Sequence, residues 1–335
     1  MTKFPLSCIM GLAFTASAIA ADAVFSHDGR FVTLIPLTGT ADYLWHVDLK
    51  TKIIGHIPLD LPKGQAVRSL AGGAEGELLV LTGEAVYVHD AKGTKELCDT
   101  SGVGDVKDLA TVPPKATGGM ADWLIVTGID KNGPEPHTRR TYYARKPGEK
   151  SFKPVFCRRI DQVGEGYFTP GGRFFFRADN ALWEGSFEDG PDIGPALVAA
   201  GIAPLAYCDS NTSNTGQYRV SDAVAVAGKS VYVALSGRHG ADLLLRVTMP
   251  AKPPTCDGTE SGDALVAHYA MQAEVLSAVK VLADDTNIES LAAALINGEE
   301  RVFYISQPHH GTSQMMLWTS RADKAEVIGE FKDEQ

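Results

Sequence analysis

The stretch FSHDGRFVTLIPLTGTADYLWHVDLKTKIIGHIPL, residues 25 to 59, consists of short apolar runs separated by polar turns. Its first seven residues, FSHDGRF, have a counterpart in FTPGGRF at 168 to 174. Each copy continues into an apolar run, a polar turn and a Leu-Trp pair, and a third such pair ends at Trp318. The intervals between Trp45, Trp183 and Trp318 are 138 and 135 residues, or three units of about 45 residues each, a period typical of propeller blades. The stretch is therefore one copy of a repeated module.

The same pattern of apolar runs divides the chain into six units. Short β-branched and aromatic runs bounded by Gly, Asp, Asn and Pro predict antiparallel strands. A four-stranded unit alone would leave one apolar face exposed, so the units must stack around an axis. We therefore predict an all-β chain that folds as a six-bladed β-propeller of four-stranded antiparallel blades. The units are 23–60, 66–99, 105–158, 162–206, one that starts at 219 and one that ends at 332.

The C-terminal third leaves a second blade number open. The third strands of the last two units lie about 73 residues apart, which exceeds a typical blade length, so seven blades are the alternative. Within this interval, AMQAEVLSAVKVL at 270 to 282 has helical periodicity and predicts a short helix inside an insertion.

The motifs at 25–31 and 168–174, with AVYVHDAKGT at 85–94, resemble the blades of exported propellers of the TolB-type and YVTN-type repeat superfamily. In strand-turn pattern the resemblance covers most of the mature chain, and in its residues it covers two or three blades. Asp-Gly supplies the positive φ that a hairpin turn needs, although the second motif has Gly171 where the first has Asp28. The resemblance implies the fold and no particular activity.

The N-terminal segment MTKFPLSCIMGLAFTASAIA has the layout of a secretory signal peptide, with Lys3 before an apolar run that finishes on an A-x-A site. We expect cleavage after Ala20, a secreted or periplasmic location, and a single propeller domain over 21–335. A lipoprotein modified at Cys8 is the less favoured alternative, because the apolar run follows that cysteine.

The charge and the hydropathy exclude some partners. The formal net charge of −10 becomes −11 when Lys3 is removed, which argues against nucleic acid and against an anionic membrane surface. No later segment reaches the roughly 18 uninterrupted apolar residues of a membrane helix. We expect a monomer that binds a protein, a glycan or a small molecule.

Four cysteines remain in the mature chain, namely Cys98, Cys157, Cys208 and Cys256. An even number in an exported protein permits two disulfides. We predict a bond between Cys208 and Cys256, which both lie in the longer inserts around the fifth unit. The alternative is four isolated thiols, because free cysteine is readily buried.

Several histidines lie in the loops between second and third strands, and loops on a rigid scaffold commonly carry function. Because histidine binds metals and anions and transfers protons near neutral pH, these residues are candidate ligand-binding residues. They are His137, His239, His309 and His310, with Asp242 as a further ligand. Solvated loop histidines without a joint site are the alternative. Arg139 and Arg140 follow His137, but neighbouring residues on a strand face opposite sides, which argues against a shared ligand.

Three acidic residues precede apolar runs at comparable places in their units, and they are Glu165, Asp222 and Glu289. Six-bladed propellers include lactonases of the gluconolactonase type, which hold a divalent metal with carboxylates on inner strands. That likeness makes the three acids candidate metal ligands. Calcium is a possible cofactor for a second reason, because ADDTNIES at 283–290 supplies Asp284, Asp285, Asn287 and Glu289 at alternating positions, although a turn capped by its own side chains explains them equally.

Two functions follow from these candidates. The chain lacks a GxSxG elbow, a P-loop and a GxGxxG motif, so the first is a non-catalytic exported propeller that binds through its loop face or central channel. The second is a metal-dependent hydrolase or lactonase with its site at the channel mouth. Convergence of three or more of the acids and histidines within metal-ligand distance distinguishes the two.

Overall fold

The chain of 335 residues forms a ring of antiparallel sheets in a computed structural model. The described residues are 23–36, 42–73, 77–112, 121–132, 136–160, 163–168, 174–178, 181–190, 194–207, 218–237, 243–248, 273–278, 286–308 and 312–331.

Six four-stranded sheets are described, each built from four consecutive strands. The first four sheets are β1 (Ala23–Phe25), β2 (Phe31–Leu34), β3 (Tyr43–Asp48) and β4 (Ile53–Pro58); β5 (Ser69–Gly72), β6 (Leu78–Leu81), β7 (Ala85–Asp90) and β8 (Gly93–Asp99); β9 (Asp105–Val112), β10 (Asp122–Asp130), β11 (His137–Arg145) and β12 (Lys153–Ile160); and β13 (Val163–Phe168), β14 (Phe174–Ala178), β15 (Ala181–Gly190) and β16 (Gly194–Tyr207). The last two are β17 (Tyr218–Ala227), β18 (Ser230–Gly237), β19 (Leu243–Thr248) and β20 (Ala273–Ala278); and β21 (Thr286–Ile296), β22 (Glu299–Pro308), β23 (Ser313–Thr319) and β24 (Glu326–Phe331).

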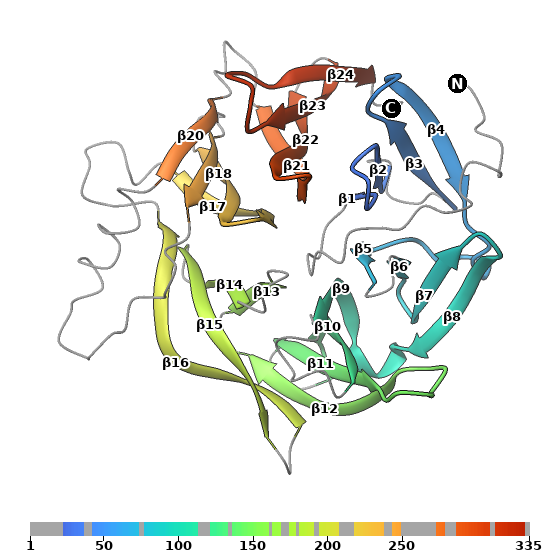
Figure 1. Ribbon diagram of the computed structural model, residues 1–335. Coiled ribbons are helices and arrows are strands. Elements are labelled where there is room, and N and C mark those ends of the chain that lie inside the picture. The colour runs from blue at the N-terminus through green and yellow to red at the C-terminus, as the bar shows by residue number, and fades with distance from the viewer. Residues whose placement is uncertain are drawn as a thin grey trace.

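The first strand of each sheet lies nearest the axis of the ring, and the fourth strand lies at its outside (Figure 1). Going round the ring, β1 contacts β5, β5 contacts β9, and the series continues through β13, β17 and β21 back to β1. We call the sheets blades 1 to 6 in chain order. Five blades are described with side chains in whole or in part, whereas blade 4, which holds β13–β16, is described by its backbone and pairing alone.

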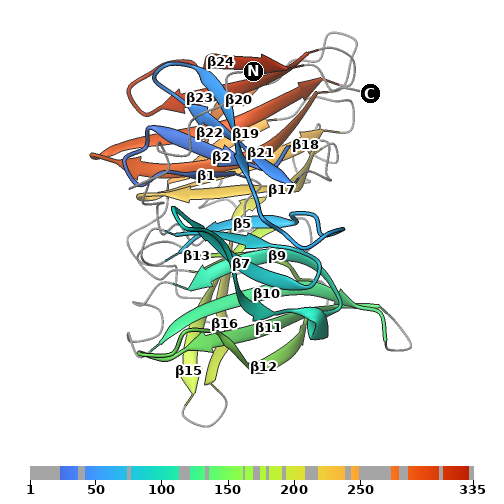
Figure 2. The ribbon, with the colours of Figure 1, turned by 90° about the vertical axis from the view of Figure 1, so that its right-hand side faces the viewer.

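Blades 1 and 6 close the ring by packing, because neither takes a strand from the other end of the chain. Their facing sides share one buried cluster that contains Phe25, Val32 and Trp45 of blade 1 with Ile296 and Phe303 of blade 6. Figure 2 shows these two sheets side by side from a second direction. The hydrophobic effect is therefore the main force that holds the two ends of the chain together.

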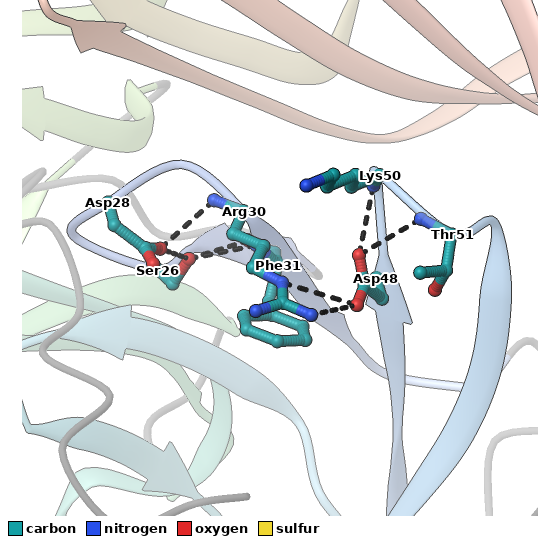
Figure 3. A network of polar contacts seen from close by, with 7 residues as sticks. All are labelled: Ser26, Asp28, Arg30, Phe31, Asp48, Lys50 and Thr51. Carbon is teal, nitrogen blue, oxygen red and sulfur yellow. Dashed lines mark hydrogen bonds and ion pairs between the residues drawn. The ribbon is translucent and has the colours of Figure 1, made fainter.

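The FSHDGRF motif forms the turn between β1 and β2 through a set of local hydrogen bonds (Figure 3). Ser26 Oγ donates to Asp28 Oδ1 at 2.7 Å, and the backbone N–H of Phe31 donates to Ser26 Oγ at 2.9 Å. The Arg30 guanidinium then reaches Asp48 Oδ2 at 2.8 Å, which links this turn to the turn after β3. The motif is thus a structural turn, as its residue types indicate.

Gly29 is the residue of this turn that no other amino acid can replace without strain. Its φ is 67°, in the left-handed region that favours glycine. A Cβ at this position would lie 2.6 Å from Cγ1 of Ile296 in blade 6, so the turn also sits tightly against the neighbouring blade. Arg301 of blade 6 donates to the Gly29 carbonyl at 2.9 Å. The copy of the motif at 25–31 therefore takes part in closing the ring.

The fold class predicted from the sequence needs correction in the C-terminal half. Trp45, Trp183 and Trp318 all lie on third strands, β3, β15 and β23, but the second interval spans two blades and not three. The prediction of three equal units there is wrong because blade 5 extends from 218 to 278. The same long blade gave rise to the seven-blade alternative, which is also wrong, since no seventh sheet occurs in the described ranges.

The predicted helix at 270–282 is wrong as well. Residues Ala273–Ala278 form β20, the outer strand of blade 5, which pairs with β19. Its Ala, Val and Leu residues suit both structures, and the pairing along the edge of β19 provides backbone hydrogen bonds that override the weak helical preference. The insert at 249–272, which separates the two strands, lies outside the described residues.

The described residues test the predictions on disulfides and on membrane-spanning segments only in part. Cys98 is a buried free thiol and Cys157 an exposed one, while Cys208 and Cys256 lie outside the described residues, so their predicted bond stays a prediction. The same holds for the signal peptide at 1–20. Within the described ranges, the chain has no apolar helix of membrane-spanning length.

Candidate functional site at the starting face of the inner strands

All six inner strands begin at one face of the ring, which we call the starting face. Antiparallel pairing brings the end of each second strand to the same face, as the pairs Tyr218 with Gly237 and Thr286 with Pro308 show. The loops from second to third strand therefore open there too, and Asp130 pairs with His137 across one of them. The candidate histidines therefore belong to, or adjoin, connections that open at the starting face.

The inner strands of blades 3 to 6 share an irregularity close to this face. The pairing of β13 with β14 shifts between Val163 and Gly166, that of β17 with β18 between Val220 and Val224, and that of β21 with β22 between Glu289 and Ala292. In each case the extra residues belong to the inner strand. β9 has a similar shift opposite Thr127 and Gly128, which leaves Lys107 without a paired residue. The short inner strands β1 and β5 pair without any shift.

The three acidic residues predicted from the sequence coincide with these shifts. Glu165 and Asp222 lie within the shifted segments of β13 and β17, and Glu289 is the last paired residue before the shift in β21. Such irregularities leave residues unpaired and redirect their side chains, and they occur frequently beside functional sites. The structure thus brings the three acids to equivalent places on three consecutive inner strands, while their side chains lie outside what it describes.

The backbone of β21 is strained at the same place. Ser290, which follows Glu289, has a φ of 51° and is 5% exposed. A left-handed conformation is uncommon for serine, and such residues persist only where the surrounding structure holds them. No glycine marks this position, so sequence reasoning missed it, as it missed Lys107.

His137 and the two arginines after it are described with their side chains. His137 is half-buried at the start of β11, opposite Asp130. The pKa of the Asp130 carboxyl lies below its usual range, mainly because the backbone N–H of Asn132 donates to it at 2.9 Å, with the charges of His137 and Arg139 adding to the effect.

Arg139 and Arg140 face opposite sides of the sheet, as the alternation along a strand predicts. Arg139 is partly exposed, with its guanidinium 3.3 Å from Asp130 Oδ2 and 3.1 Å from the sulfur of Cys157. Arg140 is fully buried on the other side. Because the two guanidinium groups lie on different sides of the sheet, they form no joint anion clamp.

The remaining candidates are placed only in part. His239, Asp242, His309 and His310 lie outside the described residues, in the segments 238–242 and 309–311 that join β18 to β19 and β22 to β23. Asp284 and Asp285 lie outside them too, whereas Asn287 and Glu289 are paired residues of β21. Residues 286–290 of this segment therefore belong to a strand, and the calcium prediction stays a prediction. Among the described residues, no three His, Cys, Asp or Glu side chains are placed to hold a metal ion.

The ring of four-stranded antiparallel sheets is the defining feature of a β-propeller. No protein-family model matches the chain, and no curated protein matches it. Among solved structures, the WD40 domain of SCAP from fission yeast shares 9% identity at a TM-score of 0.41, over 95% of this chain and 84% of that one. The β-propeller domain of the Trilobed protease from Pyrococcus furiosus shares 12% identity at a TM-score of 0.46, over 95% and 85%.

A prolyl endopeptidase shares 10% identity at a TM-score of 0.45, over 94% of this chain and 49% of that one, so this chain spans about half of that enzyme. Similarity at these levels assigns the chain to no family and to no activity. The resemblance to TolB-type and YVTN-type propellers stays a prediction.

Proposed function

We propose that the protein is an exported, non-catalytic β-propeller that binds a ligand at the starting face of its inner strands. The observation that carries this proposal is the coincidence of Glu165, Asp222 and Glu289 with register shifts on three neighbouring inner strands. A regular ring would need no shifts for stability, as β1 and β5 demonstrate by pairing without any. Shifts that recur at one level of the ring support a shared site.

The residue types at these positions indicate the chemistry of the ligand. Ionised carboxylates accept hydrogen bonds and attract positive charge. A ligand that presents hydroxyl or ammonium groups, such as a glycan or a basic segment of a protein, fits such a face. The N-terminal signal pattern supports export, which would place the protein among ligands of that kind.

A metal-dependent hydrolase or lactonase is the second candidate, because the same three acids are oxygen ligands of the type that divalent cations prefer. In that function the acids would hold the cation, and the loop histidines of blades 5 and 6 would stand beside it as acid or base. This candidate requires a bound metal, whereas the first does not.

One experiment tests the first proposal and distinguishes it from the second. Purified protein is analysed for metal content, then titrated with Ca²⁺, with chito-oligosaccharides and with oligolysine, and screened for lactone and phosphoester hydrolysis. The variant E165Q/D222N/E289Q is compared with D60N/E84Q/E96Q, which removes the same charge from exposed positions of blades 1 and 2.

We expect the first variant, and not the second, to lose binding of one probe at least tenfold. Binding that survives the triple substitution would contradict the proposed site. Stoichiometric metal together with hydrolysis would favour the enzyme.

A further inference from the structure

The interface between blades 1 and 2 differs from the other described interfaces in containing two buried histidines. His46 on β3 lies on the same side of its sheet as Leu44, and His89 on β7 lies on the same side as Tyr87. Leu44 and Tyr87 belong to the one buried cluster that joins these two blades. Both imidazoles therefore face this interface, and they are only 2% and 6% exposed.

Each imidazole makes a hydrogen bond to a threonine on the neighbouring strand of its own sheet. Nδ1 of His46 lies 3.0 Å from Thr33 Oγ1, and Nδ1 of His89 lies 3.0 Å from Thr94 Oγ1. Thr94 Oγ1 also accepts from the backbone N–H of Asp60 at 3.3 Å, so one hydroxyl group contacts His89 of blade 2 and the segment that follows blade 1.

Burial acts in the same direction on both rings. Burial lowers the pKa of His46 to about 4, although the negative charge of Asp48 acts in the opposite direction. Burial also lowers the pKa of His89, and there the negative charge of Asp90 opposes it. The charged and titratable groups around the two rings are Asp48 and Arg30 on the side of His46, and Asp60, Asp90, Glu96 and Tyr87 on the side of His89. Asp48 is occupied by Arg30 and by two backbone N–H groups, so it offers little to a new charge.

Among the interfaces whose side chains are described, this one also has the smallest buried apolar cluster. Its inner strands are the two shortest, β1 with 3 residues and β5 with 4, and its buried cluster is the smallest of the four that the described residues form. The interface between blades 5 and 6 contrasts with it, because long inner strands, a larger cluster and an ion pair between Arg246 and Glu300 hold that one together.

We propose that the interface between blades 1 and 2 is an acid-sensitive joint, at which the ring opens locally when His46 and His89 take up protons. A group with a folded pKa below its ordinary value takes up a proton on opening. The closed interface is thus fully stable above about pH 6.5 and loses stability as the pH falls toward 4. The opening equilibrium rises by up to about tenfold per pH unit for each histidine over this range.

Hydrogen–deuterium exchange of the purified protein between pH 7 and pH 5 tests the proposal, after correction for the intrinsic pH dependence of exchange. Peptides from β1–β3 and β5–β7 should lose protection by at least tenfold, while peptides from β22 and β23 keep theirs. The variant H46Q/H89Q should show no such response, and H27Q, which changes an exposed histidine, should respond as the wild type does.

A uniform loss of protection in all blades would mean global acid unfolding and would overturn the proposal. Unchanged protection, or a response that persists in H46Q/H89Q, would overturn it too. If that variant does not fold, titration of the histidine ring protons by NMR in the wild type decides, because midpoints near 6.5 for both rings contradict the proposal.

Discussion

The buried charge cluster between blades 5 and 6 provides the sharpest test of how the ring is held together. Glu300 of β22 is 8% exposed and accepts hydrogen bonds from three groups of blade 5. Ser230 Oγ donates at 2.9 Å, Tyr232 Oη at 2.7 Å and Arg246 Nη2 at 2.6 Å. Burial and the bond to Glu300 raise the pKa of Tyr232 well above its usual value, so its hydroxyl remains a donor at all physiological pH. Replacing Glu300 by glutamine keeps the shape and removes the charge that these donors face.

The loss in the free energy of unfolding of E300Q follows from how deeply Glu300 and Arg246 are buried. Removing one member of a buried ion pair costs about 3 to 5 kcal/mol, because the other charge stays desolvated. The Arg246 side chain is 27% exposed, so water relieves part of that penalty, and we take about 3 kcal/mol. At roughly 2 °C per kcal/mol for a chain of this size, the melting temperature of E300Q should fall by about 6 °C.

Thermal unfolding followed by circular dichroism measures this difference. E326Q is the matched control, since Glu326 forms an ion pair with Lys52 in which both side chains are largely exposed, and such pairs contribute about 0 to 1 kcal/mol. Y232F and the double variant E300Q/Y232F complete a cycle that isolates the bond between the two side chains. A melting temperature of E300Q within 1 °C of that of E326Q, roughly 0.5 kcal/mol, would refute the reasoning.

Three further outcomes are expected from local geometry. Gly29→Ala should destabilise by more than about 2 kcal/mol in urea unfolding, because it adds a clash with blade 6 to the strain of φ 67°, whereas Gly64→Ala, at φ 88° in open space, should cost about 1 kcal/mol. Although burial opposes it, hydrogen bonds from neighbouring groups lower the pKa of Asp48, so D48N should cost about 2 kcal/mol at pH 7 and progressively less below about pH 4. In the native protein at pH 8, iodoacetamide should label the exposed Cys157 and not Cys98, whose pKa burial raises to about 12; equal labelling in peptide mapping would contradict this.

The sequence could predict much of the fold, because the elements that define it are local. Period-2 apolar runs and turn residues mark most strands, and unit boundaries read from them fall within a few residues of those observed. The FSHDGRF turn could be predicted for the same reason, since its hydrogen bonds join residues that are a few positions apart in the sequence. The contact of Gly29 with Ile296 was not, because it joins two ends of the chain that meet only when the ring closes.

Counting residues between repeats failed where one blade departs from the average. The interval from Trp183 to Trp318 fits three units of average length, yet it holds two blades, since blade 5 alone extends over 218–278. A period is a property of regular blades, and the residues between β19 and β20 make blade 5 longer than the average unit. The number of blades in this interval is determined by strand pairing, because pairing shows which strands are neighbours in a sheet.

The candidate site could likewise be predicted from the sequence only in part. The acidic residues were found from their position before apolar runs, a local signal, but the register shifts that single them out depend on how many residues the partner strand contributes. Between Val220 and Val224 the inner strand has three residues where β18 has one, between Leu235 and Val233. No residue type in that segment encodes the mismatch, since glycine and proline are absent from it. The shifts occur on four inner strands and are missing from β1 and β5, so the described inner strands differ in structure around the ring. The three acidic residues lie on strands with shifts, and the interface with the two buried histidines lies between the strands without them.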